Sequence, residues 1–374
     1  MPNRNQRRVS IIETDIAIIG AGMAGASLAA MLGDTARVLL IDQEAQPGYH
    51  STGRSAAFWS EGYGGPRIQP LTTASGPWLA DHGFLAPRGC VHIADAAGEA
   101  DLDALEQELA GGGIETHRLD RAALDSLVPG LAPHIARGIS EPSCRDIDVA
   151  ALHAFFLREA RRAGAQLRMD ARVQRITATS GGWLLATRAG EIRARLIVNA
   201  AGAWASKVAS LAGAAPIVIQ PYRRTIVQLL TYPAMSSDMP LVMDARSQFY
   251  FKPEAGGRLW LSPHDETPVV AHDVAPEELD VALAIDRFEH VVGWNIVRRE
   301  RAWAGLRSFA PDRLPVIGYD AVAPDFFWCA GQGGFGIQTA PAAAMIAAAL
   351  LRREPLPAMV RSIEVSLYAP SRFE

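Results

Sequence analysis

Residues 15–42 read DIAIIGAGMAGASLAAMLGDTARVLLID, and this stretch decides the fold. Asp15–Gly20 and Arg37–Asp42 are short apolar runs that read as strands. The small residues between them, through Leu32, read as a helix that begins directly after a glycine-rich turn. Strand, turn, helix and strand in this order predict a βαβ unit at the N-terminal end of the chain.

Three glycines of the turn, Gly20, Gly22 and Gly25, match the fingerprint G-x-G-x-x-G in the strand-to-helix context that makes it informative. Gly20 permits the tight turn, Gly22 lets the backbone approach a pyrophosphate, and Gly25 lets helix and strand pack closely. Asp42 ends the second strand near the spacing of roughly 20 residues expected for a carboxylate that binds an adenosine ribose. The motif predicts a bound dinucleotide but does not distinguish NAD from FAD, which share that part.

Composition limits the function classes. The 374 residues are 49% hydrophobic and 20% charged, as in an ordinary soluble enzyme of two domains. A formal charge of -4 gives no reason to expect nucleic acid as a partner. The apolar stretch Ile16–Leu32 is short for a membrane span and holds the fingerprint glycines, so we expect no stable membrane insertion and a cytoplasmic location.

The three cysteines, Cys90, Cys144 and Cys329, are an odd number at wide spacing. Such spacing predicts neither a disulfide framework nor a metal site, and it favours a reducing compartment.

The rest of the chain contains further predicted helices and strands. Asp148 caps a predicted amphipathic helix, Val149–Ala163, and strands are expected between residues 166 and 200. Residues 216–301 are rich in predicted strands and suit a sheet that lines a pocket. A glycine-rich turn, Gly331–Gly336, leads into a final predicted helix from Thr339 to about Leu351.

Three further motifs follow the fingerprint: QPGYHSTGRSAA at 46–57, NAAGAW at 199–204 and GQGGFGIQT at 331–339. Together they resemble the D-amino-acid oxidase (DAO, glycine-oxidase-like) family of FAD-dependent oxidoreductases over nearly the whole chain. With WAGLRSF at 303–309, they are most similar to a bacterial branch of that family, the D-arginine dehydrogenases. No cysteine matches the covalent flavin link of sarcosine oxidases, so the resemblance implies noncovalent FAD.

The resemblance implies an α/β (α+β) fold in which a Rossmann-like FAD-binding domain is interleaved with an antiparallel-sheet substrate-binding domain. Residues 1–87, 146–215 and 301–374 would form the FAD-binding domain, and residues 88–145 and 216–300 the substrate-binding domain. The cofactor-binding residues that motif and resemblance predict are Gly20, Gly22, Ala24, Gly25, Asp42, Gln43, Ser51, Thr52, Arg54, Ser55, Ala56, Ala57, Val173, Ala201, Gly202, Trp204, Gly334, Gly336, Ile337, Gln338 and Thr339.

Oxidation of an amino acid by flavin requires a fixed substrate carboxylate, which the planar fork of an arginine binds best. Arg307 is the leading candidate, because its apolar strand-like surroundings would bury it. Arg223, Tyr250 and Tyr63 join it by resemblance. A structural ion pair is the alternative for Arg307, whereas Arg223, which stands beside Arg224, could equally be a surface charge.

Two positions depart from the D-arginine dehydrogenase pattern. Phe58 stands where a histidine is expected, and Cys90 stands where a glutamate would meet a cationic substrate side chain. A buried guanidinium without a carboxylate costs several kcal/mol, so these two residues predict an apolar pocket for a neutral substrate.

The resemblance implies oxidative deamination of a D-amino acid: a hydride passes from Cα to flavin N5, and water hydrolyses the imino acid to a 2-oxo acid and ammonia. The alternatives are an N-substituted or cyclic amino acid or a 2-hydroxy acid as substrate, a flavin subunit of a hetero-oligomeric dehydrogenase, and an NAD-dependent dehydrogenase. The electron acceptor, quinone or oxygen, and the oligomeric state are left open.

Overall fold

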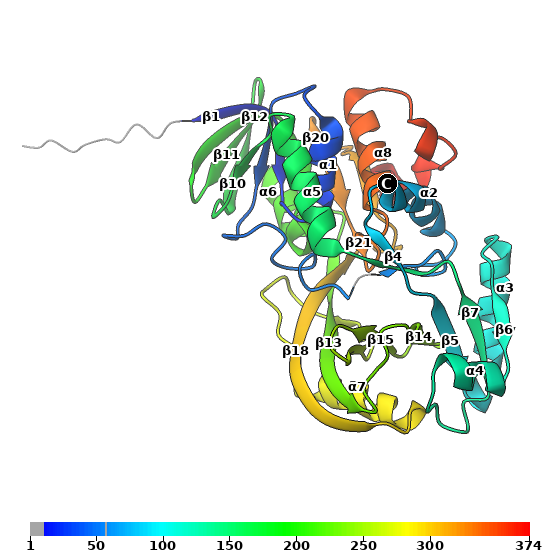
Figure 1. Ribbon diagram of the computed structural model, residues 1–374. Helices are drawn as coiled ribbons and strands as arrows, with labels where there is room; N and C mark the ends of the chain where they lie inside the picture. The colour runs from blue at the N-terminus through cyan, green and yellow to red at the C-terminus, as the bar shows by residue number, and fades with distance from the viewer. Residues whose placement is uncertain (1–10, 57) are drawn as a thin grey trace, which may run out of the picture.

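The computed structural model describes residues 11–56 and 58–374, and its strands form two large sheets (Figure 1). In the upper half of the figure, helices pack against the first sheet, and in the lower half two long curved strands run through the second. The two halves correspond to the expected Rossmann-like part and antiparallel part.

The first sheet is built around parallel strands in the order β9, β2, β1, β12, β20. A meander of β10, β11 and β12 and the antiparallel strand β19 extend it. The strands of this sheet are β1 (Ile12–Ile19), β2 (Val38–Ile41), β9 (Gln166–Arg168), β10 (Val173–Thr179), β11 (Gly182–Thr187), β12 (Gly190–Asn199), β19 (Val316–Tyr319) and β20 (Phe326–Ala330).

Both faces of this sheet are covered, which explains why its central strands are continuous apolar runs rather than alternating ones. Helix α1 (Met23–Leu32) packs against α5 (Val149–Arg162) and α8 (Ala340–Arg352) on one face. Helix α6 (Ala205–Ala212) and the meander share an apolar cluster with the other face. Asp148 caps α5 as expected, since its carboxylate accepts a hydrogen bond from Ala151 N at 2.9 Å.

The second sheet is mainly antiparallel and follows the order β21, β18, β13, β16, β15, β14, β5, β7, β6. The long strands β13 and β18 pair with each other along most of their length, and the short strand β17 also pairs with β13. Its strands are β5 (Cys90–Ala94), β6 (His117–Leu119), β7 (Arg137–Glu141), β13 (Gln220–Tyr232), β14 (Leu241–Asp244), β15 (Tyr250–Glu254), β16 (Arg258–Ser262), β17 (Thr267–Pro268), β18 (Asn295–Phe309) and β21 (Gln332–Gly333).

Smaller elements join the two sheets. Strands β3 (Phe58–Trp59), β4 (Leu85–Pro87) and β8 (Arg145–Ile147) form a short third sheet. The remaining α-helices of the described residues are α2 (Gln69–Asp81), α3 (Glu99–Gly111), α4 (Arg121–Leu127) and α7 (Glu278–Val291). Among those residues no helix is long and apolar enough to cross a membrane.

The structure confirms the predicted βαβ unit and adds two details. Helix α7 lies inside the segment 216–301, where strands are expected, and it buries Val281, Ala284 and Phe288 against the second sheet. The predicted domain boundary at residue 301 falls within β18, because that strand stays paired with β13 as far as Phe309. The division into two domains otherwise stays a prediction.

Candidate active site

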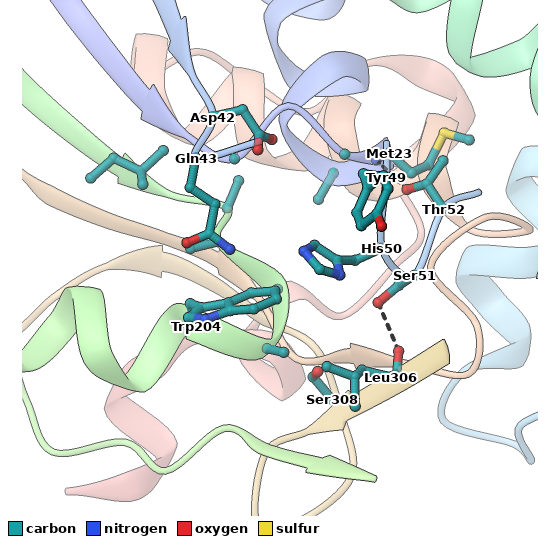
Figure 2. A pocket seen from close by; sticks show the side chains of 18 of the residues that line it. Met23, Asp42, Gln43, Tyr49, His50, Ser51, Thr52, Trp204, Leu306 and Ser308 are labelled. Carbon is teal, nitrogen blue, oxygen red and sulfur yellow. Dashed lines mark hydrogen bonds between the residues drawn. The ribbon is translucent and has the colours of Figure 1, made fainter. Parts of the chain in front are cut away.

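A cavity of about 430 Å³ opens at the carboxyl ends of β1 and β2. Segments far apart in the sequence line it: the turn before α1, the loop after β2, the turn after β12, the end of β18 and the turn before α8. Crevices at the carboxyl ends of parallel strands are where open α/β sheets bind ligands. Figure 2 shows the labelled side chains of this cavity.

The glycine turn takes the shape that the fingerprint requires. Gly20 has φ +112°, and a Cβ there would lie 2.2 Å from Ala200 O. A Cβ on Gly25 would lie 1.9 Å from Gly20 O, so only glycine lets α1 approach β1 this closely. Gly22, the N-cap of α1, has no side chain of its own over the helix N-terminus, a position where a phosphate can bind.

Asp42 lies at the end of β2 and faces the cavity (Figure 2). Its carboxylate accepts hydrogen bonds from Ala21 N at 2.7 Å and Glu44 N at 3.0 Å. Burial raises the pKa of this carboxyl, while the two backbone donors lower it. These contacts tie the carboxylate to the glycine turn, the position expected for an adenosine ribose partner.

The loop after β2 joins the two sheets. Ser51 Oγ donates to Leu306 O on β18 at 2.7 Å (Figure 2), and Thr52 Oγ1 accepts from Met23 N at 3.0 Å. His50 projects into the cavity toward Trp204, with ring centroids 4.5 Å apart. One wall of the cavity therefore depends on contacts between segments that the sequence places 255 residues apart.

Two buried polar atoms of this cavity, His50 Nδ1 and Ser308 Oγ, have no hydrogen-bond partner within the described part of the chain. Buried polar atoms are rarely left unsatisfied, so such atoms in a cavity wall indicate a polar ligand. Together with the glycine turn and Asp42, they fit FAD.

Most of the predicted cofactor-binding residues line this cavity. They are Gly20, Gly22, Ala24, Asp42, Gln43, Ser51, Thr52, Ser55, Val173, Ala201, Gly202, Trp204, Gly334, Gly336 and Ile337. The other predicted cofactor-binding residues contact other parts of the chain or lie outside the described residues. Gly25 packs against the glycine turn, Arg54 binds Asp273 and the carbonyl groups of Val274 and Ala304, and Ala56 joins an apolar cluster. Gln338 binds the Ser60–Tyr63 segment, Thr339 binds Phe335 O, and Ala57 lies outside the described residues.

Arg307, on β18, lines the same cavity and is only 6% exposed. Its Nη1 donates a long hydrogen bond of 3.4 Å to Leu306 O, and no carboxylate within residues 11–56 and 58–374 forms an ion pair with it. Burial, followed by the nearby charge of Arg224, lowers the pKa of its guanidinium. A buried guanidinium without an acid is expected to bind an anionic ligand.

Arg223 and Arg224 are consecutive on β13 and therefore point to opposite faces of the sheet. Arg223, expected in the site, forms ion pairs with Glu277, with Asp280 at 2.7 Å and with Asp265 at 3.7 Å. These three carboxylates already occupy its guanidinium, and the structure does not bring it together with Arg307. Arg224 was not among the predicted site residues, and it is the arginine that donates a hydrogen bond to Tyr63.

Tyr63 is fixed by two neighbours. Its hydroxyl lies 3.1 Å from His264 Nε2, and Arg224 Nη1 donates to it at 3.3 Å. His264 Nδ1 lies 2.6 Å from Ser247 O, an acceptor, so the ring proton is on Nδ1 and Nε2 accepts the Tyr63 hydroxyl proton. Burial and the charge of Arg224 lower the pKa of His264 to about 3, which keeps its ring neutral.

Phe58 and Tyr250 belong to a buried apolar cluster that packs against Tyr63. The Phe58 ring packs edge-on against Tyr63 at 5.0 Å and Tyr250 at 5.8 Å. Burial, and then Tyr63, raise the pKa of Tyr250, so its hydroxyl stays protonated. Cys90 belongs to the same apolar cluster. Phe58 and Cys90 therefore belong to one apolar cluster, and their role in substrate choice stays a prediction.

A smaller cavity of about 230 Å³ lies beside this group and is lined by Tyr63, Arg224 and His264. It adjoins the larger cavity at Gly334, which lines the first and would bring a Cβ to 3.3 Å from Tyr63 Oη.

Residues 15–350 match the family model described as DAO: FAD dependent oxidoreductase. The chain belongs to this family. A relative in Agrobacterium tumefaciens, one of the subunits of an opine oxidase, is 27% identical over 86% of this chain and 89% of its own length. Hydrogen cyanide synthase subunit HcnC of Pseudomonas aeruginosa is 26% identical over 68% of this chain, which spans 60% of that relative's length.

The crystal structure of glycine oxidase from Geobacillus kaustophilus superposes with a TM-score of 0.83 at 23% identity and covers 96% of this chain and 98% of its own. This likeness confirms the predicted fold, a Rossmann-like FAD domain combined with a substrate domain. None of these three relatives is a D-arginine dehydrogenase, so the closer likeness to that branch stays a prediction. The chain is an FAD-dependent oxidoreductase of the DAO family, and the NAD-dependent alternative is wrong.

Proposed function

We propose that this enzyme oxidises the Cα–N bond of an amino acid with a free carboxylate and a neutral, apolar side chain, and that it takes the D-enantiomer. The observation that carries the proposal is Arg307, a buried guanidinium that faces the FAD cavity without an acid partner among the described residues. Its planar fork suits bidentate binding of a carboxylate. The relatives named for amino-acid-type substrates, opine and glycine, support an amine donor.

When bound, FAD supplies the hydride acceptor for the α-carbon. Gly22 and the N-terminus of α1 would receive its pyrophosphate, and Asp42 its adenosine ribose. His50 and Ser308 would provide the two buried polar atoms that otherwise have no partner in the described chain.

The chain's own residues bind and orient the substrate. Arg307 holds the carboxylate, which fixes the position of Cα relative to the cavity. Tyr63 is held rigidly, because it donates to His264 Nε2 and accepts from Arg224. Tyr250, buried and protonated, can donate a further hydrogen bond to the carboxylate. No described side chain needs to serve as base, because the amine can lose its proton to water.

Phe58 supports a neutral substrate. Its buried ring packs against both tyrosines, so a side chain directed there would leave water for an aromatic wall. An apolar side chain gains free energy from this transfer, whereas a cationic one loses it unless a carboxylate compensates.

Turnover with an artificial electron acceptor tests the proposal. Neutral D-amino acids should be oxidised to 2-oxo acids with release of ammonia, and the matched amino-acid amides, which lack the carboxylate, should be poor substrates. Equal rates with acids and amides would contradict the carboxylate role of Arg307. Oxygen consumption without the acceptor would distinguish an oxidase from a dehydrogenase that uses a quinone.

A second candidate is an N-substituted amino acid, oxidised by this chain as one component of a larger dehydrogenase. The likeness to the opine oxidase relative over 86% of this chain favours it. Adding N-methyl and N-carboxyalkyl amino acids to the substrate panel separates the two candidates. Turnover by the isolated chain would show that no partner subunit is required.

A further inference from the structure

A cluster of three metal-ligating side chains lies buried beside the substrate region and is not used by the reaction proposed above. Cys90, His92 and Glu141 place a thiol, an imidazole nitrogen and a carboxylate oxygen within 4.8 Å of one another. All three residues are buried, and Glu141 has no exposed surface. A buried carboxylate is usually paired with a cation or bound to a metal, and among the described residues only His92, at 3.6 Å, is placed to be a cation for Glu141, so the arrangement calls for an explanation.

The sheet register produces the cluster. Cys90 and His92 are two residues apart on β5 and therefore project from the same face. Glu141, on β7, is directly opposite Cys90 in the antiparallel pair. Three adjacent ligands from two paired strands form a rigid set of donors, which is what a metal site requires.

The distances are compatible with a shared metal ion, and the Cys90–His92 contact is also within the range of a sulfur hydrogen bond. His92 Nε2 lies 3.7 Å from Cys90 Sγ and 3.6 Å from Glu141 Oε2. A nitrogen–oxygen hydrogen bond is about 2.9 Å long, so the His92–Glu141 separation is too large for one. Zinc bonds of about 2.3 Å to sulfur and about 2.0 Å to nitrogen or oxygen, at tetrahedral angles, place neighbouring ligand atoms roughly 3.3 to 3.6 Å apart.

The charges also balance. A divalent cation with the Cys90 thiolate and the Glu141 carboxylate forms a neutral unit, and His92 contributes a neutral nitrogen. Ser60 Oγ at 3.0 Å and Gly62 N at 3.4 Å donate to the carboxylate of Glu141 and would fix its orientation as metal ligands require.

We propose that Cys90, His92 and Glu141 form a zinc-class metal site that anchors the loop carrying Tyr63. Water would complete the tetrahedron and keep the unit neutral, and Cys144 lies beside Cys90 in the same cluster. His92 also lines the 230 Å³ cavity with Tyr63, so the ion would lie in the wall of the substrate region. Through Ser60 and Gly62, Glu141 would connect it to the segment that precedes Tyr63.

The first test is metal content. Untagged holoenzyme, dialysed against Zn²⁺ and then against buffer, should retain one zinc per chain by elemental analysis. Cys90→Ser, His92→Ala and Glu141→Gln should each lose it, whereas Cys329→Ser, which changes a buried cysteine outside the cluster, should retain it. Bound FAD, measured in every variant, shows which variants have folded.

The second test uses the unaltered protein, so it does not depend on the folding of variants. With Co²⁺ in place of Zn²⁺, the enzyme should show tetrahedral d–d absorption at wavelengths longer than those of flavin, and X-ray absorption of the zinc form should detect at least one sulfur ligand. Wild-type protein with no more zinc than the His92→Ala variant would overturn the proposal, as would zinc bound without sulfur. Because neither readout is activity, failure here leaves the proposed substrate untouched.

Discussion

At the scale of single residues, Arg307 and Arg223 are two buried guanidinium groups in opposite situations. We expect Arg307→Met to lower kcat/KM for the amino acid by roughly 30-fold to 5,000-fold, because losing one partner of a buried charge pair costs about 2 to 5 kcal/mol. The effect should lie mainly in KM, with FAD content unchanged.

The matched control is Arg223→Met, which leaves Glu277, Asp280 and Asp265 without their shared cation. This variant should lower the melting temperature while KM stays near the wild-type value. Steady-state kinetics and thermal melts of the two variants check the contrast, and a large rise in KM for Arg223→Met would return that residue to the substrate site.

His264 gives a prediction on pH. Its pKa is about 3 in the folded protein against 6.5 ordinarily, so between these values only the unfolded chain binds the proton. Stability is therefore lost as the pH falls through 6.5 toward 3, by up to about 2 kcal/mol on reaching pH 5. His264→Asn should show a smaller loss of melting temperature from pH 7 to 5 than the wild type; parallel curves would contradict the neutral, buried histidine.

At the scale of elements, the first turn of α1 tolerates only glycine where it contacts the end of β1. Gly25→Ala would bring Cβ to 1.9 Å from Gly20 O, so α1 must move away from β1, and we expect loss of bound FAD and a lower melting temperature. Gly111→Ala is the control, because this position, also helical, has open space around it. The ratio of flavin to protein absorbance measures the difference.

The same elements show what could be predicted from sequence. The βαβ unit was predictable because its signal is local: apolar runs, three glycines and Asp42 lie within 28 residues. Helix α7 was not, because its alternation of charged and apolar residues lies within a segment dominated by strands. The cluster of Cys90, His92 and Glu141 was missed for a related reason, since strand pairing joins positions that sequence spacing separates.

Side-chain direction explains the remaining difference in the site. The sequence pointed to an arginine at the start of β13, but choosing between Arg223 and Arg224 requires knowing which face of the sheet each one occupies. His264 carried no motif, and it joins Tyr63 only because the chain folds back after β16. Most cofactor-binding residues predicted by resemblance do line the cavity. They lie on glycine-rich loops, whose local sequence already determines where the chain turns.

At the scale of the whole molecule, residues from both large sheets line the FAD cavity, so the cofactor should stabilise the protein as a unit. We expect the apoprotein to melt below the holoenzyme and added FAD to restore the transition, by about 2.7 kcal/mol at a hundredfold excess over Kd. Acid precipitation should release all the flavin, since the predicted attachment is noncovalent. Flavin retained in the precipitate would contradict this.

The central claim, a carboxylate-binding site that presents a neutral D-amino acid to FAD, is tested most directly by the absorption spectrum of the purified enzyme under anaerobic conditions. Neutral apolar D-amino acids should bleach the flavin band, while their L-enantiomers and the matched amides leave it unchanged. A yellow enzyme that no amino acid bleaches, or that only L-enantiomers bleach, would contradict the account.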